Sequence, residues 1–177
     1  PENGDPSRAG VAIADISTGM FAANAILAAL YSREQTGKGQ RIDMSLLDSQ
    51  VALLSYAATN YFVSGSITNR LGNAHPNIVP YQSFKARDMH FVLAVGNDKQ
   101  WEILCKSINK PEWIDDKKYS TNAVRVNNRK VLIDHLSKLF ATQNAKYWLD
   151  IFDEVGLPSG PINELDKVFE NEQIKSR

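Results

Sequence analysis

The sequence predicts an α/β fold in two parts, and two patterns support this prediction. In the first sixty residues, two apolar helical segments flank a short stretch of alternating polarity, which is typical of part of an α/β layer. Beyond residue 80, two alternating segments precede several helical ones, as in a smaller α+β domain. Residues 65–80 lie between the two parts and contain Gly65, Gly72, Pro76 and Pro80. Connections of this length are usually functional or mobile, so we predict a domain boundary there.

The first helix is predicted from apolar residues at helical spacing between Met20 and Leu30. Ser17 and Thr18 are good N-cap residue types, and the helix is expected to end near Arg33, before the glycines of residues 37–39. Residues 41–45 alternate in polarity as a short strand would. A second apolar helix is then expected from about residue 46 to residue 63.

The second part begins with two predicted strands, Tyr81–Ala86 and His90–Val95. Residues 87–89 join them, which predicts a hairpin. Helices are expected to follow at about residues 99–108, 122–140 and 145–155, and a short last helix at about 165–170. Residues 157–161 contain two prolines and one glycine and interrupt the helical pattern.

Composition excludes several classes of protein. The 177 residues carry 20 basic and 20 acidic side chains, so no global positive charge favours nucleic-acid binding. The single cysteine, Cys105, cannot form an internal disulfide and lies in a predicted helix, so we interpret it as a buried structural thiol. His75, His90 and His135 are far apart and show no metal-ligand spacing, so no metal site is predicted. No uninterrupted apolar run approaches ~20 residues, so no membrane span is predicted.

Asp15 is the strongest candidate for a chemical role. It is the only charged residue between Val11 and Tyr31. A carboxylate between apolar segments is expected to be desolvated or placed for a purpose, and a helix N-terminus stabilises its negative charge. The alternative is that Asp15 only caps the helix, since Asp is a preferred N-cap residue.

Several segments carry a resemblance to a known family. A run of small apolar residues leads to Asp15 and then to Thr18-Gly19, and an Arg-x-x-Thr-Gly-x-Gly-Gln-x-Ile-Asp pattern follows. The matching segments are residues 10–20, Arg33–Asp43, Arg70–Pro76 with Pro80-Tyr81, Asn97–Trp101 and Pro158–Asn163. Together they resemble the family III CoA-transferases, the formyl-CoA transferase and carnitine CoA-transferase (CaiB/BaiF) group. Within that family the sequence is most similar to the succinate–hydroxymethylglutarate CoA-transferases.

The resemblance implies a fold and an assembly. Residues 1–64 would be the carboxy-proximal part of a Rossmann-like large α/β domain that binds CoA. Residues 65–80 would be the linker, and residues 81–177 the small α+β domain with the start of a return segment. The chain lacks an initiator Met and begins with loop-forming residues, so we expect a fragment without the amino-terminal part of the large domain. The complete protein would form an interlocked homodimer.

The resemblance also implies the chemistry. Asp15 would be the nucleophile that carries CoA as an aspartyl-CoA thioester, with acyl-CoA and a carboxylic acid as substrates and no tightly bound cofactor, metal, nucleic acid or membrane partner. The amides of the Ser17–Gly19 turn are candidates for stabilising an oxyanion. A cytoplasmic location, or the mitochondrial matrix in a eukaryote, is expected.

Further binding residues are weaker candidates, and each has a structural alternative. Thr18 and Gly19 would contact CoA, and a basic cluster of Arg33, Lys38 and Arg41 would hold its phosphates, unless it only complements the helix end. Gly72 and Asn73 are candidates for a flap over the acyl group, or else form a plain interdomain turn. His75 is a candidate for substrate contact, or else an ordinary loop histidine.

Two other functions stay open. In α-methylacyl-CoA racemases, a related group, the corresponding Asp acts as an acid or base beside a histidine that would lie upstream of Pro1. The sequence Ser17-Thr18-Gly19 favours transfer, because racemases tend to have a glycine-rich run there. The chain could also be an inactive folding or dimerisation unit, since half of the CoA site would be absent.

Overall fold

The computed structural model describes residues 7–67 and 69–177. The chain divides after Arg70 into two compact units, here called unit 1 (up to Arg70) and unit 2 (from Leu71 onward). The predicted domain boundaries at residues 64 and 80 refer to the complete protein and stay a prediction. In this chain, residues 71–80 belong to unit 2.

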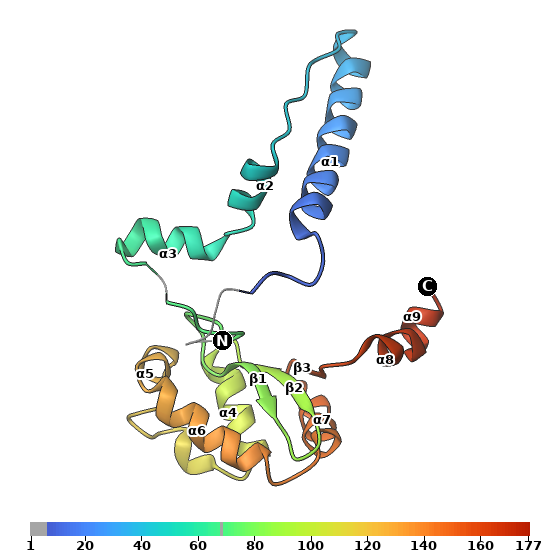
Figure 1. The fold of residues 1–177 in the computed structure, drawn as a ribbon. Coiled ribbons are helices and arrows are strands. Elements are labelled where there is room, and N and C mark those ends of the chain that lie inside the picture. Colours follow the sequence, from blue (N-terminus) through green and yellow to red (C-terminus); the bar gives the residue numbers. More distant parts are fainter. Residues whose placement is uncertain (1–6, 68) are drawn as a thin grey trace. The chain divides into compact units, whose positions relative to one another are not determined.

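Unit 1 contains the helices α1 (Ile13–Thr36), α2 (Leu46–Ala52) and α3 (Tyr56–Ser64), shown from blue to teal in Figure 1. The first helix begins earlier than predicted, so Ser17 and Thr18 are not N-caps. Their hydroxyls donate to carbonyls of the preceding turn, Ser17 to Ile13 at 2.7 Å and Thr18 to Ala14 at 2.7 Å, which lets both residues sit inside the helix. At the other end Gly37 adopts φ 68° and its amide bonds to Arg33, a glycine C-cap.

Two other predictions for unit 1 are wrong. Residues 41–45 form no strand, because a strand needs a hydrogen-bonded neighbour and the described part of unit 1 contains none. Ser45 is instead the N-cap of α2, where its hydroxyl accepts from the amide of Asp48 at 3.2 Å. The single helix expected over residues 46–63 is two helices, separated by a turn in which Ser55 adopts a positive φ of 46°.

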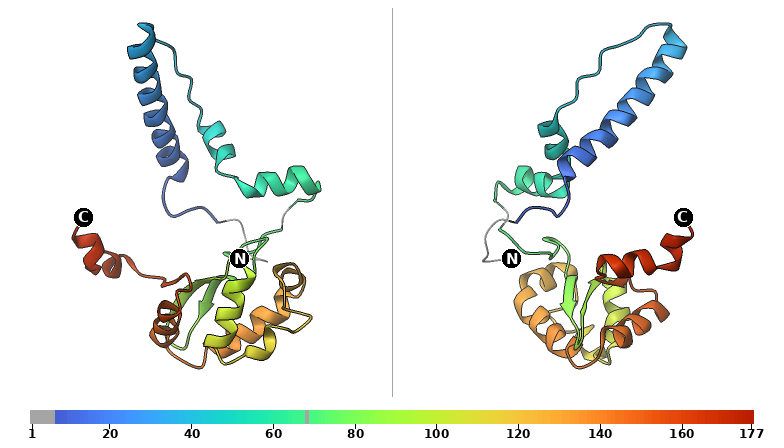
Figure 2. Two further views of the ribbon diagram at one scale, coloured as in Figure 1. Left: turned by 180° about the vertical axis from the view of Figure 1, so that it is seen from behind. Right: turned by 45° about the vertical axis from the view of Figure 1, so that its right-hand side comes forward.

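Unit 1 has almost no core of its own. α1 packs against α2, as the two views of Figure 2 show, but Ser17 and Ser49 are the only side chains buried in its described residues. Large apolar side chains are exposed instead, among them Met20 at 65%, Leu27 at 65% and Phe62 at 79%. An apolar surface of this extent is typical of an element that other protein covers.

One helix among the described residues, α1, is long and apolar enough to cross a membrane. The sequence contains no uninterrupted apolar run of about 20 residues, but α1 meets the criteria for a span because its few polar residues leave the mean hydropathy of the helix high. Core helices of soluble proteins meet the same criteria of length and composition, so this finding is weak evidence by itself.

Unit 2 is built on an antiparallel sheet with strand order β1-β2-β3. The predicted hairpin is confirmed: β1 (Tyr81–Lys85) pairs with β2 (His90–Ala94), and Lys85 lies opposite His90. The third strand, β3 (Ser159–Pro161), was not predicted. It is short and contains proline, which is tolerated at the edge of a sheet, and it pairs with β2 so that Leu93 lies opposite Ser159.

The helices of unit 2 largely follow the prediction. They are α4 (Asp98–Ser107), a 3₁₀ turn (Pro111–Trp113), α5 (Asn122–Asn127), α6 (Arg129–Phe140), α7 (Ala145–Glu154), α8 (Leu165–Glu170) and α9 (Glu172–Lys175). The single helix expected over residues 122–140 is divided at Asn128, and α9 was not predicted. Side-chain caps define three of the starts, since Asn97 accepts from the amide of Gln100, Thr121 from the amide of Val124, and Asn171 from the amide of Gln173.

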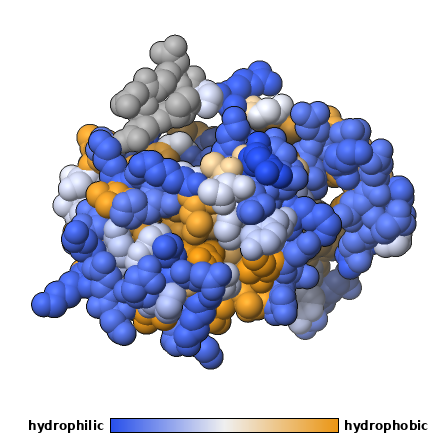
Figure 3. Space-filling view, turned by 90° about the horizontal axis from the view of Figure 1, so that it is seen from below, coloured by the Kyte–Doolittle hydropathy of each residue, from blue (hydrophilic) through white to orange (hydrophobic). Residues whose placement is uncertain are grey.

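Phe140 lies at the centre of an aromatic core in unit 2. Its ring centroid is 5.0 Å from that of Phe84, 5.3 Å from Phe91, 5.2 Å from Trp148 and 5.9 Å from Phe152. The core thus joins the hairpin to α6 and α7. The face shown in Figure 3 is mostly hydrophilic, with apolar side chains visible in a limited area between charged ones.

Candidate functional site

Asp15 lies in the first turn of α1, three residues after the N-cap position, which Ala12 occupies without a side-chain hydrogen bond. Asp15 is therefore not the N-cap residue. Its side chain is exposed, which corrects the expectation of a desolvated carboxylate, and no described residue gives the carboxylate a hydrogen bond or an ion pair. The carboxylate is thus free to react or to bind within unit 1.

Two backbone amides beside Asp15 are also available. The amide of Ile13 bonds to Val11 and the amide of Ile16 bonds to Ala12, whereas the amides of Ala14 and Asp15 have no acceptor among the described residues. The expectation for the Ser17–Gly19 amides is wrong, because these residues lie inside α1, where amides bond to carbonyls of the preceding turn. Candidate oxyanion donors are therefore found one turn earlier.

A shallow cavity of about 280 Å³ adjoins this end of α1. Ala12 and Ala14 contribute to its wall, together with Arg8 before the helix and Gln50 from α2. No sequence pattern indicated Arg8 or Gln50 as a site residue. Arg8 lies outside the periodic segment, and Gln50 reaches this end of α1 only through the packing of α2.

The basic cluster predicted to bind CoA phosphates lies at the opposite end of α1. Arg33 is in the last turn, exposed, and 3.5 Å from the carboxylate of its neighbour Glu34. At ~1.5 Å rise per residue, Arg33 is about 27 Å from Asp15 along the helix. Lys38 follows the C-cap glycine and is also exposed. Gly19, another candidate, lies near the start of α1 and faces open space. Unit 1 therefore does not bring Arg33 and Lys38 to Asp15.

Asn73 and His75 are held against β1 of unit 2. The side-chain amide of Asn73 donates to the hydroxyl of Ser83 and accepts from the Ser83 amide at 3.1 Å. Gly72, just before it, adopts φ 65°, a conformation that favours glycine. These contacts fit a fixed turn better than a mobile flap.

The ring of His75 has a defined orientation. It stacks on Tyr81 with centroids 5.3 Å apart, and its Nδ1 accepts from the amide of Asn77 at 3.1 Å. Burial lowers the pKa of His75, and the positive charge of Arg129 lowers it further. His75 is thus stabilised as a neutral imidazole whose remaining nitrogen carries the proton.

Side chains from α5 anchor the end of this loop. Asn122 accepts from the amide of Val79 at 3.1 Å and donates to the carbonyl of Asn77 at 2.8 Å. Arg125 is fully buried and donates to the carbonyl of Val79 at 2.8 Å. Sequence reasoning missed these residues, since they lie more than forty positions from the loop they hold.

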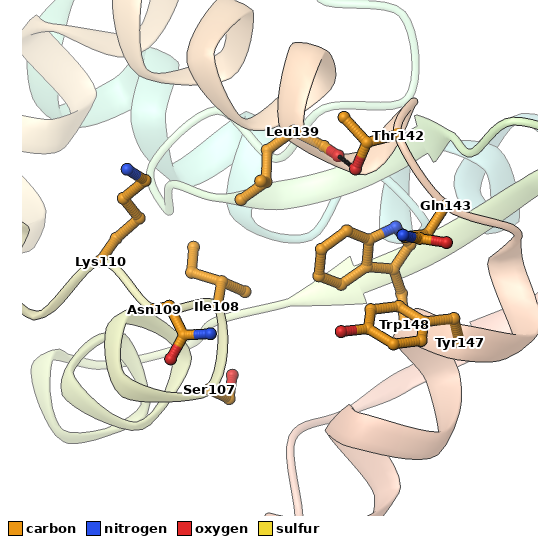
Figure 4. Close-up of a pocket in the computed structure, with 9 residues that line it drawn as sticks. All are labelled: Ser107, Ile108, Asn109, Lys110, Leu139, Thr142, Gln143, Tyr147 and Trp148. Atoms are coloured by element: carbon orange, nitrogen blue, oxygen red, sulfur yellow. Dashed lines mark hydrogen bonds between the residues drawn. The ribbon is translucent and has the colours of Figure 1, made fainter.

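Unit 2 also contains a pocket of about 310 Å³ that none of the predicted site residues lines (Figure 4). Ile108, Leu139 and Trp148 supply apolar surface, and Lys110 and Tyr147 are among its polar residues. Leu139 is ten residues beyond Arg129 in α6, so the pocket and the His75 loop lie at opposite ends of that helix, about 15 Å apart along its axis.

The described residues give little support to a reactive cysteine or to a metal site. Cys105 is confirmed as buried, and burial raises the pKa of its thiol to about 12, which disfavours the reactive thiolate. Within residues 7–67 and 69–177, no group of three His, Cys, Asp or Glu side chains is arranged to hold a metal ion.

Comparisons with known proteins agree on one family. The model of CoA-transferase family III matches residues 1–177. The chain is 49% identical over 98% of its length to succinyl-CoA:glutarate CoA-transferase of Mus musculus, and 41% identical over 99% to succinate–glutarate CoA-transferase of Agrobacterium fabrum. It spans 40% and 44% of those proteins. A crystal structure of a CAIB/BAIF family protein from Brucella suis matches with 40% identity and a TM-score of 0.75, over 99% of this chain and 47% of that one.

Proposed function

Because the chain belongs to CoA-transferase family III, we propose that the complete protein transfers CoA between carboxylic acids with Asp15 as the nucleophile. One observation carries the assignment of the residue. Asp15 is an exposed carboxylate in the first turn of α1, it lacks a partner among the described residues, and two amides without acceptors lie beside it. A helix N-terminus favours negative charge, both on Asp15 and on an oxyanion formed there.

The reaction would proceed by covalent catalysis in balanced steps. The Asp15 carboxylate attacks the thioester carbonyl of the donor, the carbon–sulfur bond breaks, and CoA thiolate leaves a mixed anhydride. The thiolate attacks the aspartyl carbonyl and releases the donor acid, so that Asp15 carries CoA as a thioester. The acceptor carboxylate then repeats both steps in reverse and restores Asp15.

Each step passes through a tetrahedral intermediate that needs hydrogen-bond donors for its oxyanion. The amides of Ala14 and Asp15 are suitable in chemistry and in position, since both belong to the same turn as the nucleophile. Gly19 and Thr18 follow in the next turn, where the absence of a side chain on Gly19 leaves the helix surface open to a ligand.

We infer a dicarboxylic acid as one substrate of the complete protein. This inference is supported by the names of the mouse and Agrobacterium relatives, both of which refer to glutarate and to succinyl or succinate. An interlocked homodimer, and a cytoplasmic or matrix location, belong to the same proposal. The chain from Pro1 to Arg177 by itself is expected to be inactive, because much of the CoA pocket is proposed to lie outside it.

The test is to trap the intermediate in the complete protein. After incubation with succinyl-CoA, hydroxylamine should convert Asp15 to a hydroxamate that peptide mass spectrometry detects. Asp15→Asn is expected to reduce exchange by on the order of 10³-fold or more while the fold persists, because the nucleophile is lost. A folded Asp15→Asn protein with near wild-type exchange would assign Asp15 a structural role.

Asp48→Asn is the matched control. Asp48 is also exposed and also lies three residues after the N-cap, in α2, so the substitution removes the same charge from an equivalent helix position. It is expected to leave exchange unchanged. Solvent deuterium appearing at the α-carbon of the acyl group, with no modified Asp15 peptide, would instead indicate the racemase activity.

A further inference from the structure

Arg129, the first residue of α6, holds two successive carbonyls of the His75 loop. Its Nη2 donates to the carbonyl of His75 at 2.7 Å and to that of Pro76 at 2.8 Å. A planar guanidinium has directed donors, so these bonds set both the position and the tilt of the peptide between the two residues.

The environment of Arg129 is unusual for a charged side chain. Among the described residues it has no carboxylate partner, and its Nη1 is buried without a hydrogen bond. Burial lowers the pKa of Arg129. Arg125 in the adjacent helix differs, since Asp98 pairs with it at 2.7 Å and its other donors reach carbonyls. Burial of the Arg129 guanidinium therefore costs desolvation free energy, and the hydrogen bonds that offset this cost go to carbonyls of the His75 loop.

His75 is held by contacts from several groups, Arg129 among them. Its carbonyl is held by Arg129, its amide bonds to the carbonyl of Tyr81 at 2.9 Å, and its ring stacks on Tyr81. Its Nδ1 accepts from Asn77, which leaves the proton of the neutral ring on Nε2. Backbone, ring plane and tautomer of His75 are thus all determined, a degree of order expected for a side chain that must meet a ligand in one geometry.

We propose that Arg129 is a positioning residue for the CoA-transfer reaction, and that it acts by fixing the placement of His75, the candidate for substrate contact in the loop that precedes β1. The proposal rests on the proposed function of the complete protein. It assigns to Arg129 an effect on the reaction that is transmitted through His75, since Arg129 itself touches the loop backbone. Small displacements of a group that contacts a substrate reduce rates strongly.

The test is a double-mutant cycle in the complete protein, measuring kcat and KM for succinyl-CoA and glutarate. Arg129→Met keeps the apolar stem and removes the donors, and it is expected to lower kcat/KM by about 10- to 100-fold. His75→Asn is expected to cause a similar loss. In the double variant the second substitution should lower kcat/KM by less than about a further 3-fold, because both substitutions disturb the placement of the same residue, His75. Arg129→Lys, which retains a charged donor, is expected to restore part of the rate.

Lys130→Met is the matched control, since Lys130 is exposed, adjacent, and carries the same charge. It should leave both kinetic constants unchanged. Wild-type kinetics in a folded Arg129→Met protein, or losses that add in full with those of His75→Asn, would overturn the proposal. If Arg129→Met does not fold, the same double-mutant cycle is measured with Arg129→Lys in its place. Absence of exchange in the wild-type protein, or full activity of Asp15→Asn, would instead remove the proposed function and this inference with it.

Discussion

Individual residues in this chain take roles that depend on the backbone around them. Ser17 and Thr18 are residue types that begin helices, yet here they bond to carbonyls inside α1, and the helix begins at Ile13. That displacement moves the free amides from the Ser17–Gly19 segment to Ala14 and Asp15. The role of Asp15 as nucleophile stays a proposal, and the candidate oxyanion donors beside it are now the amides of Ala14 and Asp15.

His75 gives a prediction about pH. Its pKa in the folded state is lowered from 6.5, first by burial and then by Arg129, so the unfolded chain takes up a proton at higher pH than the folded one. The contribution of His75 to stability is therefore fully present above pH 6.5 and is lost as the pH falls through its lower folded-state value. Urea unfolding of the complete protein at about pH 7.5 and about pH 5.5 should show this loss.

His75→Gln should make the stability of the protein less dependent on pH over the same interval, since the titrating group is gone. His90→Gln, which replaces an exposed histidine of β2, serves as the comparison. An equally steep loss of stability in His75→Gln and wild-type protein would assign the effect to other groups.

At the scale of elements, α1 and α5 are two helices whose own sequences do not show what they contact in the folded protein. α1 has the length and composition of a membrane span and exposes most of its apolar side chains. It also carries Asp15 and packs on α2, and Ser17 is its buried residue. α5 is short and weakly apolar, yet Arg125 and Asn122 within it anchor the loop that leads into β1.

Arg125 gives a prediction about stability. It is fully buried, pairs with Asp98, lies over the ring of Trp101 at 4.9 Å, and donates to the carbonyls of Val79 and Tyr119. Arg125→Met leaves both carbonyls without donors and is expected to reduce the free energy of unfolding by about 2–4 kcal/mol. Chemical denaturation would measure the change, and Lys130→Met, at an exposed position nearby, should cost less than about 0.5 kcal/mol. A neutral Arg125→Met would contradict an anchoring role.

At the scale of the whole molecule, the two units differ in what they bury. Unit 2 has a continuous core around Phe140, whereas the described part of unit 1 buries only Ser17 and Ser49. Burial of apolar side chains is the main source of folding free energy, so the two units are not expected to be equally autonomous.

The expected outcome is that residues 71–177 fold alone, with a cooperative urea transition and a near-ultraviolet circular dichroism signal from Trp101, Trp113 and Trp148. Residues 1–70 are expected to show neither a cooperative transition nor fixed tertiary structure, because their apolar surfaces lack a cover. A cooperative transition in the isolated 1–70 segment would show that its helices need no cover.

Local patterns in the sequence were sufficient for several conclusions. Local patterns predicted α4, α7, α8 and the β1–β2 hairpin, because each of these is stabilised by contacts between near neighbours in the chain. Cys105 was correctly expected to be buried. The motifs around Asp15 and Arg33–Asp43 were specific enough to indicate the family that the comparisons show.

The tertiary structure decided the rest, and the reason is the distance along the chain between interacting groups. β3 exists because Ser159–Pro161 lies beside β2, and the strand expected at residues 41–45 fails because no neighbour pairs with it in the described part of unit 1. Arg129 reaches carbonyls more than fifty residues earlier in the chain. Contacts of this kind leave no periodic signal in either segment, so a sequence can contain both partners without indicating that they meet.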